Sequence, residues 1–329
     1  MRRPFRRRAR LAPLALAVNA LLAGCSAPVQ PATPPPTAVA PTASPSPSPS
    51  ASVASTPDPG CGDPTASLRP QGSLPAPGSF PPGSYMKSIY DRGSMVAGVS
   101  RDTLLFGSVN PSTGQIEGFD IDILRQVARA IFGDESRIEF RVITPAQRIP
   151  ALQDGSVDVV GRTFTVNCAR WRQIDFSSVY YASGQRLLVP RGSPIRSLQD
   201  VAGKRVCAPA GTTAIDNLTH VPGHPIPVAA ADQTDCLVML ELGEVDAAAN
   251  DESVLLSLAA QDPSMVVVGP KFTSEPYGLG IAQSHPEFVR FVNAVLERVR
   301  GDGTWSSIYN RWLGRFGPNP GPPAARYRD

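Results

Sequence analysis

Strand-like and helix-like segments alternate along this chain in two successive series between Met95 and Leu313. Short apolar runs predict the strands, and apolar residues spaced three and four apart predict the helices. A helix is expected directly after Gly118, because its apolar residues fall on one face. The strands are predicted at 95–99, 138–142, 157–160, 204–208, 226–229, 245–251 and 265–268. This alternation predicts βαβ units and mostly parallel sheets flanked by helices.

The two series indicate two α/β lobes, and the final helices, expected at 286–300 and 304–313, return to the first lobe. A chain of 329 residues that is 42% hydrophobic is long and apolar enough for two domains. The folded body is expected to begin near Tyr85. Residues 317–329, which are rich in Pro and Gly, are expected to form a loosely ordered tail.

The N-terminal sequence predicts an export signal. Several arginines precede residue 11, an apolar stretch follows over 11–23, and Leu22-Ala23-Gly24-Cys25 ends it. A basic segment, a short apolar segment and small residues before a cleavage site are typical of a secretory signal peptide, here 1–24. The apolar stretch is too short to span a bilayer. Leu-Ala-Gly-Cys resembles the bacterial lipobox, which implies lipidation of Cys25, although an ordinary signal peptide is the alternative.

The residues after Cys25 predict a tether. Pro, Ser, Ala and Thr dominate here, and such a segment buries too little apolar surface to fold. We expect an extended spacer over 25–84 that holds the body at the extracytoplasmic face of the cell membrane. The net charge of only +3, part of it in the signal peptide, gives no reason to expect a nucleic-acid partner.

Four cysteines remain after Cys25, and an even number in an exported protein favours disulfides over zinc or redox chemistry. Three connectivities are open. We favour Cys207–Cys236, which lie in one later region, and this leaves Cys61–Cys168. A bridge that closes a loop of roughly 30 residues stabilises the fold by about 3–4 kcal/mol in the chain-entropy model.

The segment 162–170 offers the chemistry for a charged head group. Small hydroxyl residues alternate with apolar ones, and the chain then turns and presents Arg170. Backbone N–H groups and Thr165 supply donors, and the guanidinium of Arg170 matches a carboxylate. The alternative interpretation is a solvated surface arginine that pairs with Asp175.

An ordered set of motifs between Met95 and Leu313 resembles the solute-binding proteins of polar amino-acid ABC transporters, most closely the glutamine- and glutamate-binding lipoproteins of actinobacterial type. The motifs are Gly118-Phe119-Asp120-Ile121-Asp122, Ile149-Pro150-Ala151-Leu152-Gln153, Val157-Asp158-Val159, Thr163-Phe164-Thr165 with Arg170, Asp175-Phe176-Ser177, Gly203-Lys204 with Gly211-Thr212-Thr213, Asn250-Asp251, Tyr277-Gly278 and Asp302-Gly303-Thr304-Trp305 with Ile308-Tyr309 and Trp312. Any one motif is weak, but the ordered set is specific.

The resemblance implies a two-lobe α/β fold of the type II periplasmic-binding-protein kind, with two hinge strands and the ligand in the cleft. The first lobe is expected over 85–182 and 277–316, and the second over 183–276. Closure around a ligand that contacts both lobes is the expected switch.

The resemblance also implies the roles of the site residues. Arg170 binds the α-carboxylate with backbone N–H groups at Thr165 and Thr213, and the helix that starts at Thr212 favours the same anion. Asp251, which follows Asn250, binds the ammonium group with the Thr163 carbonyl and the Thr165 hydroxyl. The alternative role for Asp251 is the N-cap of the next helix.

The side-chain preference is expected to be acidic: glutamate or aspartate first, glutamine or asparagine next. Arg148 lies in the segment from which relatives that bind glutamate or aspartate direct an arginine at the distal carboxylate. Arg162 stands where relatives that bind amides often carry a small apolar residue. Ser100 replaces an acidic residue of the glutamine binders. Thr103, Pro209 and Ala210 depart from the family pattern. Either arginine is alternatively a solvated rim charge.

Other functions fit less well. An exported dehydratase on the same fold is the enzyme alternative, but no catalytic triad or phosphate loop occurs. His220 and His224 are separated by Pro222 and Gly223, which argues against a zinc-binding helix. We therefore expect no enzyme activity, metal or cofactor. The expected partners of this monomer are a free L-amino acid and an ABC permease with its ATPase, or alternatively a membrane sensor.

Overall fold

The computed structural model describes residues 61–329. The predicted signal peptide, Cys25 and the tether up to residue 60 lie outside the described residues. Within 61–329, no helix has both the length and the apolar character needed to cross a membrane.

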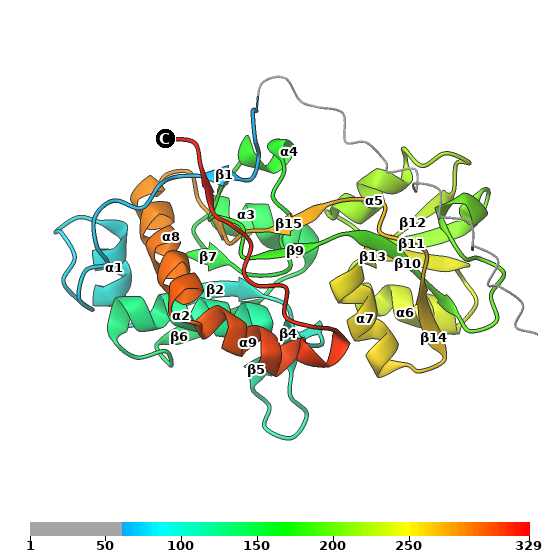
Figure 1. The fold of residues 1–329 in the computed structure, drawn as a ribbon, viewed down its shortest axis with the longest axis horizontal. Coiled ribbons are helices and arrows are strands. Elements are labelled where there is room, and N and C mark those ends of the chain that lie inside the picture. Colours follow the sequence, from blue (N-terminus) through cyan, green and yellow to red (C-terminus); the bar gives the residue numbers. More distant parts are fainter. Residues whose placement is uncertain (1–60) are drawn as a thin grey trace, which may run out of the picture. The chain divides into compact units, whose positions relative to one another are not determined.

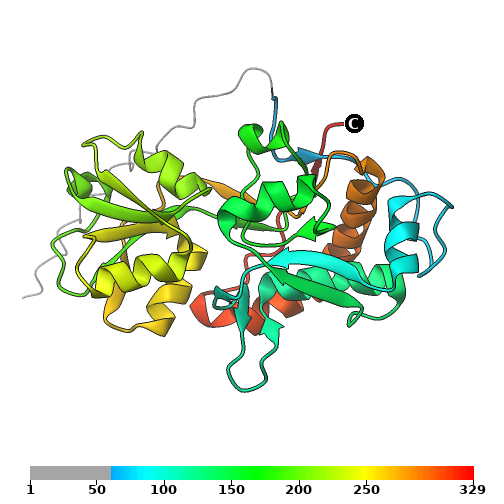
Figure 2. The ribbon, with the colours of Figure 1, turned by 180° about the vertical axis from the view of Figure 1, so that it is seen from behind.

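Two five-stranded sheets form the centres of two lobes, and each is flanked by helices (Figure 1 and, from behind, Figure 2). The first has the order β6-β2-β7-β16-β8 and the second β12-β11-β13-β10-β14. In each sheet one strand, β16 or β10, runs antiparallel to both of its neighbours, and the other strands run in one direction. The predicted two-lobe α/β fold with mostly parallel sheets is confirmed.

The strands of the first sheet are β2 (Met95–Val99), β6 (Ile138–Val142), β7 (Val159–Val160), β8 (Asp175–Phe176) and β16 (Gly280–Ile281). The strands of the second sheet are β10 (Gln185–Pro190), β11 (Arg205–Pro209), β12 (Ile226–Ala230), β13 (Ala247–Asp251) and β14 (Met265–Val268). A small antiparallel sheet contains β3 (Asp102–Thr103), β4 (Gly107–Val109) and β5 (Ile116–Glu117).

The helices bury apolar faces against these sheets. In the first lobe they are α1 (Tyr85–Arg92), α2 (Phe119–Phe132), α3 (Arg148–Gln153), α4 (Cys168–Trp171), α8 (Pro286–Gly301) and α9 (Thr304–Trp312). In the second lobe they are α5 (Thr213–Leu218), α6 (Gln233–Glu241) and α7 (Glu252–Gln261). Short 3₁₀ helices are Pro145–Gln147, Leu198–Val201 and Gly314–Phe316.

Helix α2 shows how the sequence dictates a local element. Its predicted apolar face is fully buried in the core of the first lobe, where α1, α8 and α9 contribute further apolar side chains. Gly118 precedes it with φ 144°, and a Cβ there would lie 2.3 Å from the carbonyl carbon of Phe106. Only glycine fits this start. Gly133 then ends the helix in the left-handed conformation.

Two strands connect the lobes. β9 (Tyr181–Ser183) pairs antiparallel with β15 (Glu275–Tyr277); β9 leads into β10 of the second sheet, and β15 leads back to β16 of the first. The two strands lie side by side in Figure 1, where the chain passes between the sheets. The predicted lobe boundaries fall within this pair of strands and stay predictions as domain limits.

The folded body is larger than the predicted one that starts near Tyr85. β1 (Ala66–Ser67) pairs in parallel with β17 (Arg326–Tyr327), so a segment assigned to the tether and the tail expected to be loosely ordered satisfy each other's backbone groups. The hydroxyl of Ser67 donates to the carbonyl of Phe176 at 2.6 Å, and Phe80 is buried in the first core. The Pro and Gly content of both segments conceals this long-range pairing.

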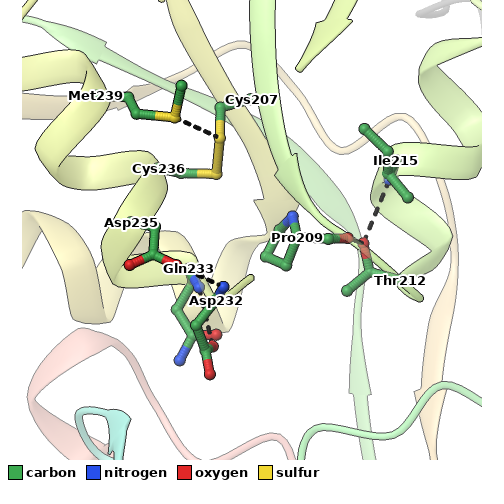
Figure 3. The surroundings of a disulfide bond; sticks show 9 residues. All are labelled: Cys207, Pro209, Thr212, Ile215, Asp232, Gln233, Asp235, Cys236 and Met239. Atoms are coloured by element: carbon green, nitrogen blue, oxygen red, sulfur yellow. Dashed lines mark hydrogen bonds between the residues drawn. A yellow bond between two sulfur atoms is a disulfide. The ribbon is translucent and has the colours of Figure 1, made fainter. Parts of the chain in front are cut away.

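Both favoured disulfides are present. Cys61–Cys168 joins the segment before β1 to α4, and Cys207–Cys236 joins β11 to α6. Figure 3 shows the second bridge between β11 and α6, with Asp232 and Gln233 at the start of α6 and Thr212 at the start of α5, the helix that follows β11. The bridge therefore ties α6 to the strand that leads to α5.

One testable consequence concerns Asn293 of α8, which is fully buried. Its Oδ1 accepts from the Ser178 N–H at 2.6 Å, and its Nδ2 donates to Ser67 Oγ and the Leu68 carbonyl. We expect Asn293→Ala to lower the free energy of unfolding by about 2–3 kcal/mol, because it leaves buried groups unpaired. Urea unfolding measures this loss, with Asn310→Ala at an exposed position as the control. Equally small losses of unfolding free energy in the two variants would contradict the stabilising role of the Asn293 hydrogen bonds to residues 67–68.

Candidate functional site

A polar pocket lies between the two lobes. Its walls come from the chain around α3 and β7 in the first lobe and from the starts of α5, α6 and α7 in the second. The lining residues are Pro145, Arg148, Arg162, Thr163, Thr165, Arg170, Thr212, Thr213, Gln233, Asn250, Asp251 and Val254. The pocket thus brings together every predicted binding residue except Ser100.

Ser100 lies outside the lining. Its side chain is buried and forms hydrogen bonds with Asp102 Oδ1 at 2.7 Å and Thr103 Oγ1 at 2.9 Å. The prediction that Ser100 touches the ligand is therefore not supported by its position: the turn at 100–103 directs its hydroxyl to neighbours in the same loop.

Thr163 has a strained backbone in the pocket wall, with φ 40° although it is not glycine. Asp120 at the start of α2 holds it, because the Thr163 N–H donates to Asp120 Oδ2 at 2.7 Å. The Tyr180 hydroxyl donates to the other oxygen at 2.7 Å. Burial raises the pKa of Asp120 to about 6, and these hydrogen bonds oppose the rise. Asp120 thus sets the direction of the Thr163 backbone.

Arg170 is 7% exposed and lies in α4, whose N-cap Asn167 accepts from the Arg170 N–H at 2.9 Å. Its guanidinium donates to the carbonyls of Thr165, at 2.6 Å, and Gly211, at 3.2 Å. It also lies 4.9 Å from the ring centroid of Phe164. Burial lowers the pKa of Arg170. The alternative of a solvated arginine paired with Asp175 is wrong, since Asp175 pairs with Arg328.

Arg148 is buried and bonded to backbone carbonyls. It donates to Pro145 at 2.9 Å, to Arg162 at 3.2 Å and, across the cleft, to Gly211 at 2.9 Å. Burial, with neighbouring arginines, lowers the pKa of Arg148 well below its usual range. Each of its nitrogens already has a protein acceptor, so Arg148 holds the two lobes together rather than offering a free fork to a ligand.

Arg162 is 2% exposed and forms an ion pair between the lobes. Its Nη2 lies 2.6 and 2.7 Å from the carboxylate oxygens of Asp232, and its Nε donates to the Ile143 carbonyl. The charge expected to select an acidic ligand is therefore neutralised by a residue of the second lobe. Neither Arg148 nor Arg162 is a solvated rim charge.

Asp251 supplies the buried negative charge from the second lobe. It stands at the N-cap position of α7 but makes no side-chain cap hydrogen bond; its Oδ2 accepts from the Tyr277 hydroxyl at 2.5 Å. Burial and then the nearby Glu275 raise the pKa of Asp251 well above its ordinary value. Asp251 is therefore the N-cap residue of α7 by position, as the alternative expected, but its carboxylate caps no N–H and lines the pocket.

The remaining predicted residues build the pocket walls. Thr212 caps α5 by accepting from the Ile215 N–H at 3.3 Å, and the Thr213 hydroxyl donates to Glu275 at 2.8 Å. The Asn250 side chain accepts from the Asp251 N–H at 2.9 Å. These bonds fix the start of α5 and the end of β13.

The lobes touch at Gly211. Its φ is 74°, and a Cβ would lie 2.7 Å from the Cα of Ala146 in the first lobe. A side chain at this position would therefore prevent the approach. Together with the Arg162–Asp232 pair, this contact shows the cleft in a closed arrangement.

The model of one protein family matches residues 95–315, described as bacterial extracellular solute-binding proteins, family 3. The chain belongs to this family. Its members are solute-binding proteins rather than enzymes, and within residues 61–329 no group of His, Cys, Asp and Glu is arranged to hold a metal ion.

Named relatives agree with this assignment. The ABC transporter glutamine-binding protein GlnH of Bacillus subtilis is 36% identical over 229 residues, which cover 69% of this chain and 84% of that protein. Glutamate-binding protein GluB of Corynebacterium glutamicum is 30% identical over 258 residues, 74% of this chain and 86% of that protein. The solved structure of an ancestral arginine-binding protein bound to glutamine has a TM-score of 0.64 and 32% identity, covering 68% of this chain and 99% of that one.

Three lining residues of this solute-binding protein were not predicted: Pro145, Gln233 and Val254. The position of Gln233 in the pocket could have been predicted, because Gln233 directly follows the predicted helix cap Asp232. The first residue of a helix can face a cleft, as Thr213 does. Pro145 and Val254 carry no such signal.

The Asp120 carboxyl predicts a pH effect on stability. Below its unfolded pKa of about 3.9 the carboxyl is protonated in both states. Between that value and the folded pKa of about 6 only the unfolded chain ionises, so rising pH lowers the free energy of unfolding by about 2–3 kcal/mol in total; the loss is complete once the folded protein ionises as well. We expect Asp120→Asn to abolish this part of the pH dependence, because asparagine does not ionise. Urea unfolding of both proteins at about pH 4 and pH 7 measures the difference, since all other groups titrate in both. An identical pH dependence in the variant would contradict the assignment.

Proposed function

We propose that this protein captures a free polar L-amino acid in the cleft and delivers it to an ABC permease. The observation that carries the proposal is the pair of buried opposite charges, Arg170 from the first lobe and Asp251 from the second, that line one pocket. A zwitterion with a carboxylate at one end and an ammonium group at the other matches that pair.

Each charge lies beside further hydrogen-bonding groups that suit one end of the ligand. Arg170 and the backbone N–H groups at Thr165 and the start of α5 are assigned to the α-carboxylate. Asp251, the Thr163 carbonyl and the Thr165 hydroxyl are assigned to the ammonium group. Each charge-assisted hydrogen bond contributes roughly 1.5–3 kcal/mol, so a few of them, less ordering costs, account for micromolar affinity at about 8 kcal/mol.

The ligand's own side chain is proposed to be that of glutamine or glutamate, because relatives named for each are similar to this chain. The expected preference for acidic ligands rested on Arg148 and Arg162 as spare cations and on Ser100 in place of an acidic residue. Both arginines have protein partners and Ser100 lies outside the pocket lining, so these residues do not favour an acidic side chain over an amide.

Delivery to a permease is favoured over presentation to a sensor, since GlnH is named as part of an ABC transporter. The contacts between the lobes support closure as the step that marks the loaded form. We further propose that Cys25 carries a lipid that holds the protein at the extracytoplasmic face of the membrane.

Removing either buried charge should weaken ligand binding strongly. We expect Arg170→Ala and Asp251→Asn each to weaken glutamine and glutamate binding by roughly 100-fold or more, because each loses charge-assisted hydrogen bonds. Calorimetry on protein unfolded and refolded to remove carried ligand measures this. Arg137→Ala and Asp91→Asn, both exposed, are matched controls. Near-normal affinity in both charge variants would contradict the proposal.

The anchor has a separate test. Cys25→Ser should move the protein from the membrane fraction to the soluble exported fraction and abolish incorporation of labelled fatty acid, because the thiol is the proposed acylation site. A wild-type protein that takes up no label would refute the lipid anchor and leave the ligand site unaffected.

A further inference from the structure

Gln233 is a pocket residue that touches both lobes. It is the first residue of α6 in the second lobe and is 3% exposed. Its Nε2 donates across the cleft to Asp102 Oδ1 and to Thr103 Oγ1, each at 2.5 Å. Both amide hydrogens are therefore used on the first lobe.

The network around Asp102 fixes which way the Gln233 amide points. A carboxylate only accepts hydrogen bonds, and Asp102 accepts from Ser100 Oγ at 2.7 Å, from Gln233 and from Thr234 Oγ1. A rotated amide would place its oxygen against this carboxylate, and the two acceptors would repel each other.

Thr103 reinforces the same orientation. The single hydroxyl proton of Ser100 is used on Asp102, so in the 2.9 Å contact between Ser100 and Thr103 the Thr103 hydroxyl is the donor. The Thr103 oxygen is then left as an acceptor for Gln233. Ser100, which is outside the pocket lining, thus acts on the pocket through two neighbours.

Gln233 Oε1 is the group left for the ligand. Among residues 61–329 the hydrogen bonds of Gln233 use its Nε2 and its backbone N–H, which donates to Asp232. Its side chain lines the pocket, so an oriented carbonyl oxygen is available there as an acceptor. A second acceptor attracts a donor and repels an anion.

We infer that Gln233, oriented by Asp102, is a specificity-determining residue that selects a ligand side chain ending in an amide N–H₂ over one ending in a carboxylate. This rests on the proposed function and deepens it to the side-chain class of the amino acid. Arg148 and Arg162 agree with it, because Arg148 donates to backbone carbonyls and the charge of Arg162 is paired with Asp232.

The test compares glutamine and glutamate on each variant by calorimetry. Wild-type protein should bind glutamine roughly tenfold or more tighter than glutamate. Asp102→Asn lets the Gln233 amide rotate, because asparagine both donates and accepts, and should reduce this ratio. Gln233→Met removes the oriented acceptor at similar length and should bring the ratio toward one.

Thr234→Val is the matched control, since it removes another hydrogen bond to Asp102 across the cleft and leaves Gln233 in place. It should weaken both ligands by the same factor and keep the ratio. A wild-type ratio at or below one, or a ratio unchanged in both Asp102→Asn and Gln233→Met, would overturn the inference. Failure of both amino acids to bind wild-type protein would instead overturn the proposed function.

Discussion

The structure depends on two buried opposite charges, one from each lobe, that line the same pocket without forming an ion pair with each other. Arg170 is held by the carbonyls of Thr165 and Gly211, and Asp251 by the Tyr277 hydroxyl. Burying such groups is costly unless a counter-charge is present, and the cost shows in the lowered pKa of Arg170 and the raised pKa of Asp251. A zwitterionic ligand supplies both counter-charges at once, so binding and the relief of this cost are the same event.

The contacts between the lobes form around that pocket. Arg162 pairs with Asp232, Arg148 donates to Gly211, and Gln233 reaches Asp102. Each joins a group of the first lobe to the start of α5 or α6, and the Cys207–Cys236 bridge ties α6 to β11, the strand that leads to α5. Because the contacts need both lobes in place, they exist only in the closed arrangement, and the ligand's two ends favour the same arrangement.

The sequence was informative where function follows from an ordered set of local motifs. The two series of strands and helices predicted the sheets, and Arg170 and Asp251 were recognisable from the segments that present them. What the sequence did not show depended on distant partners. Arg148 and Arg162 line the pocket as expected, but nothing in the local sequence shows that Gly211 and Asp232 accept their hydrogen bonds. Ser100 was assigned to the ligand for the same reason, and the pairing of β1 with β17 was hidden by proline and glycine.

A crystal structure of the protein with glutamine bound tests the roles of the two buried charges most directly. We expect the α-carboxylate to lie within hydrogen-bond distance of the Arg170 guanidinium while the ammonium group of the same molecule contacts the Asp251 carboxylate. A bound glutamine that touches only one of these two side chains, or that lies outside the cleft, would contradict this expectation.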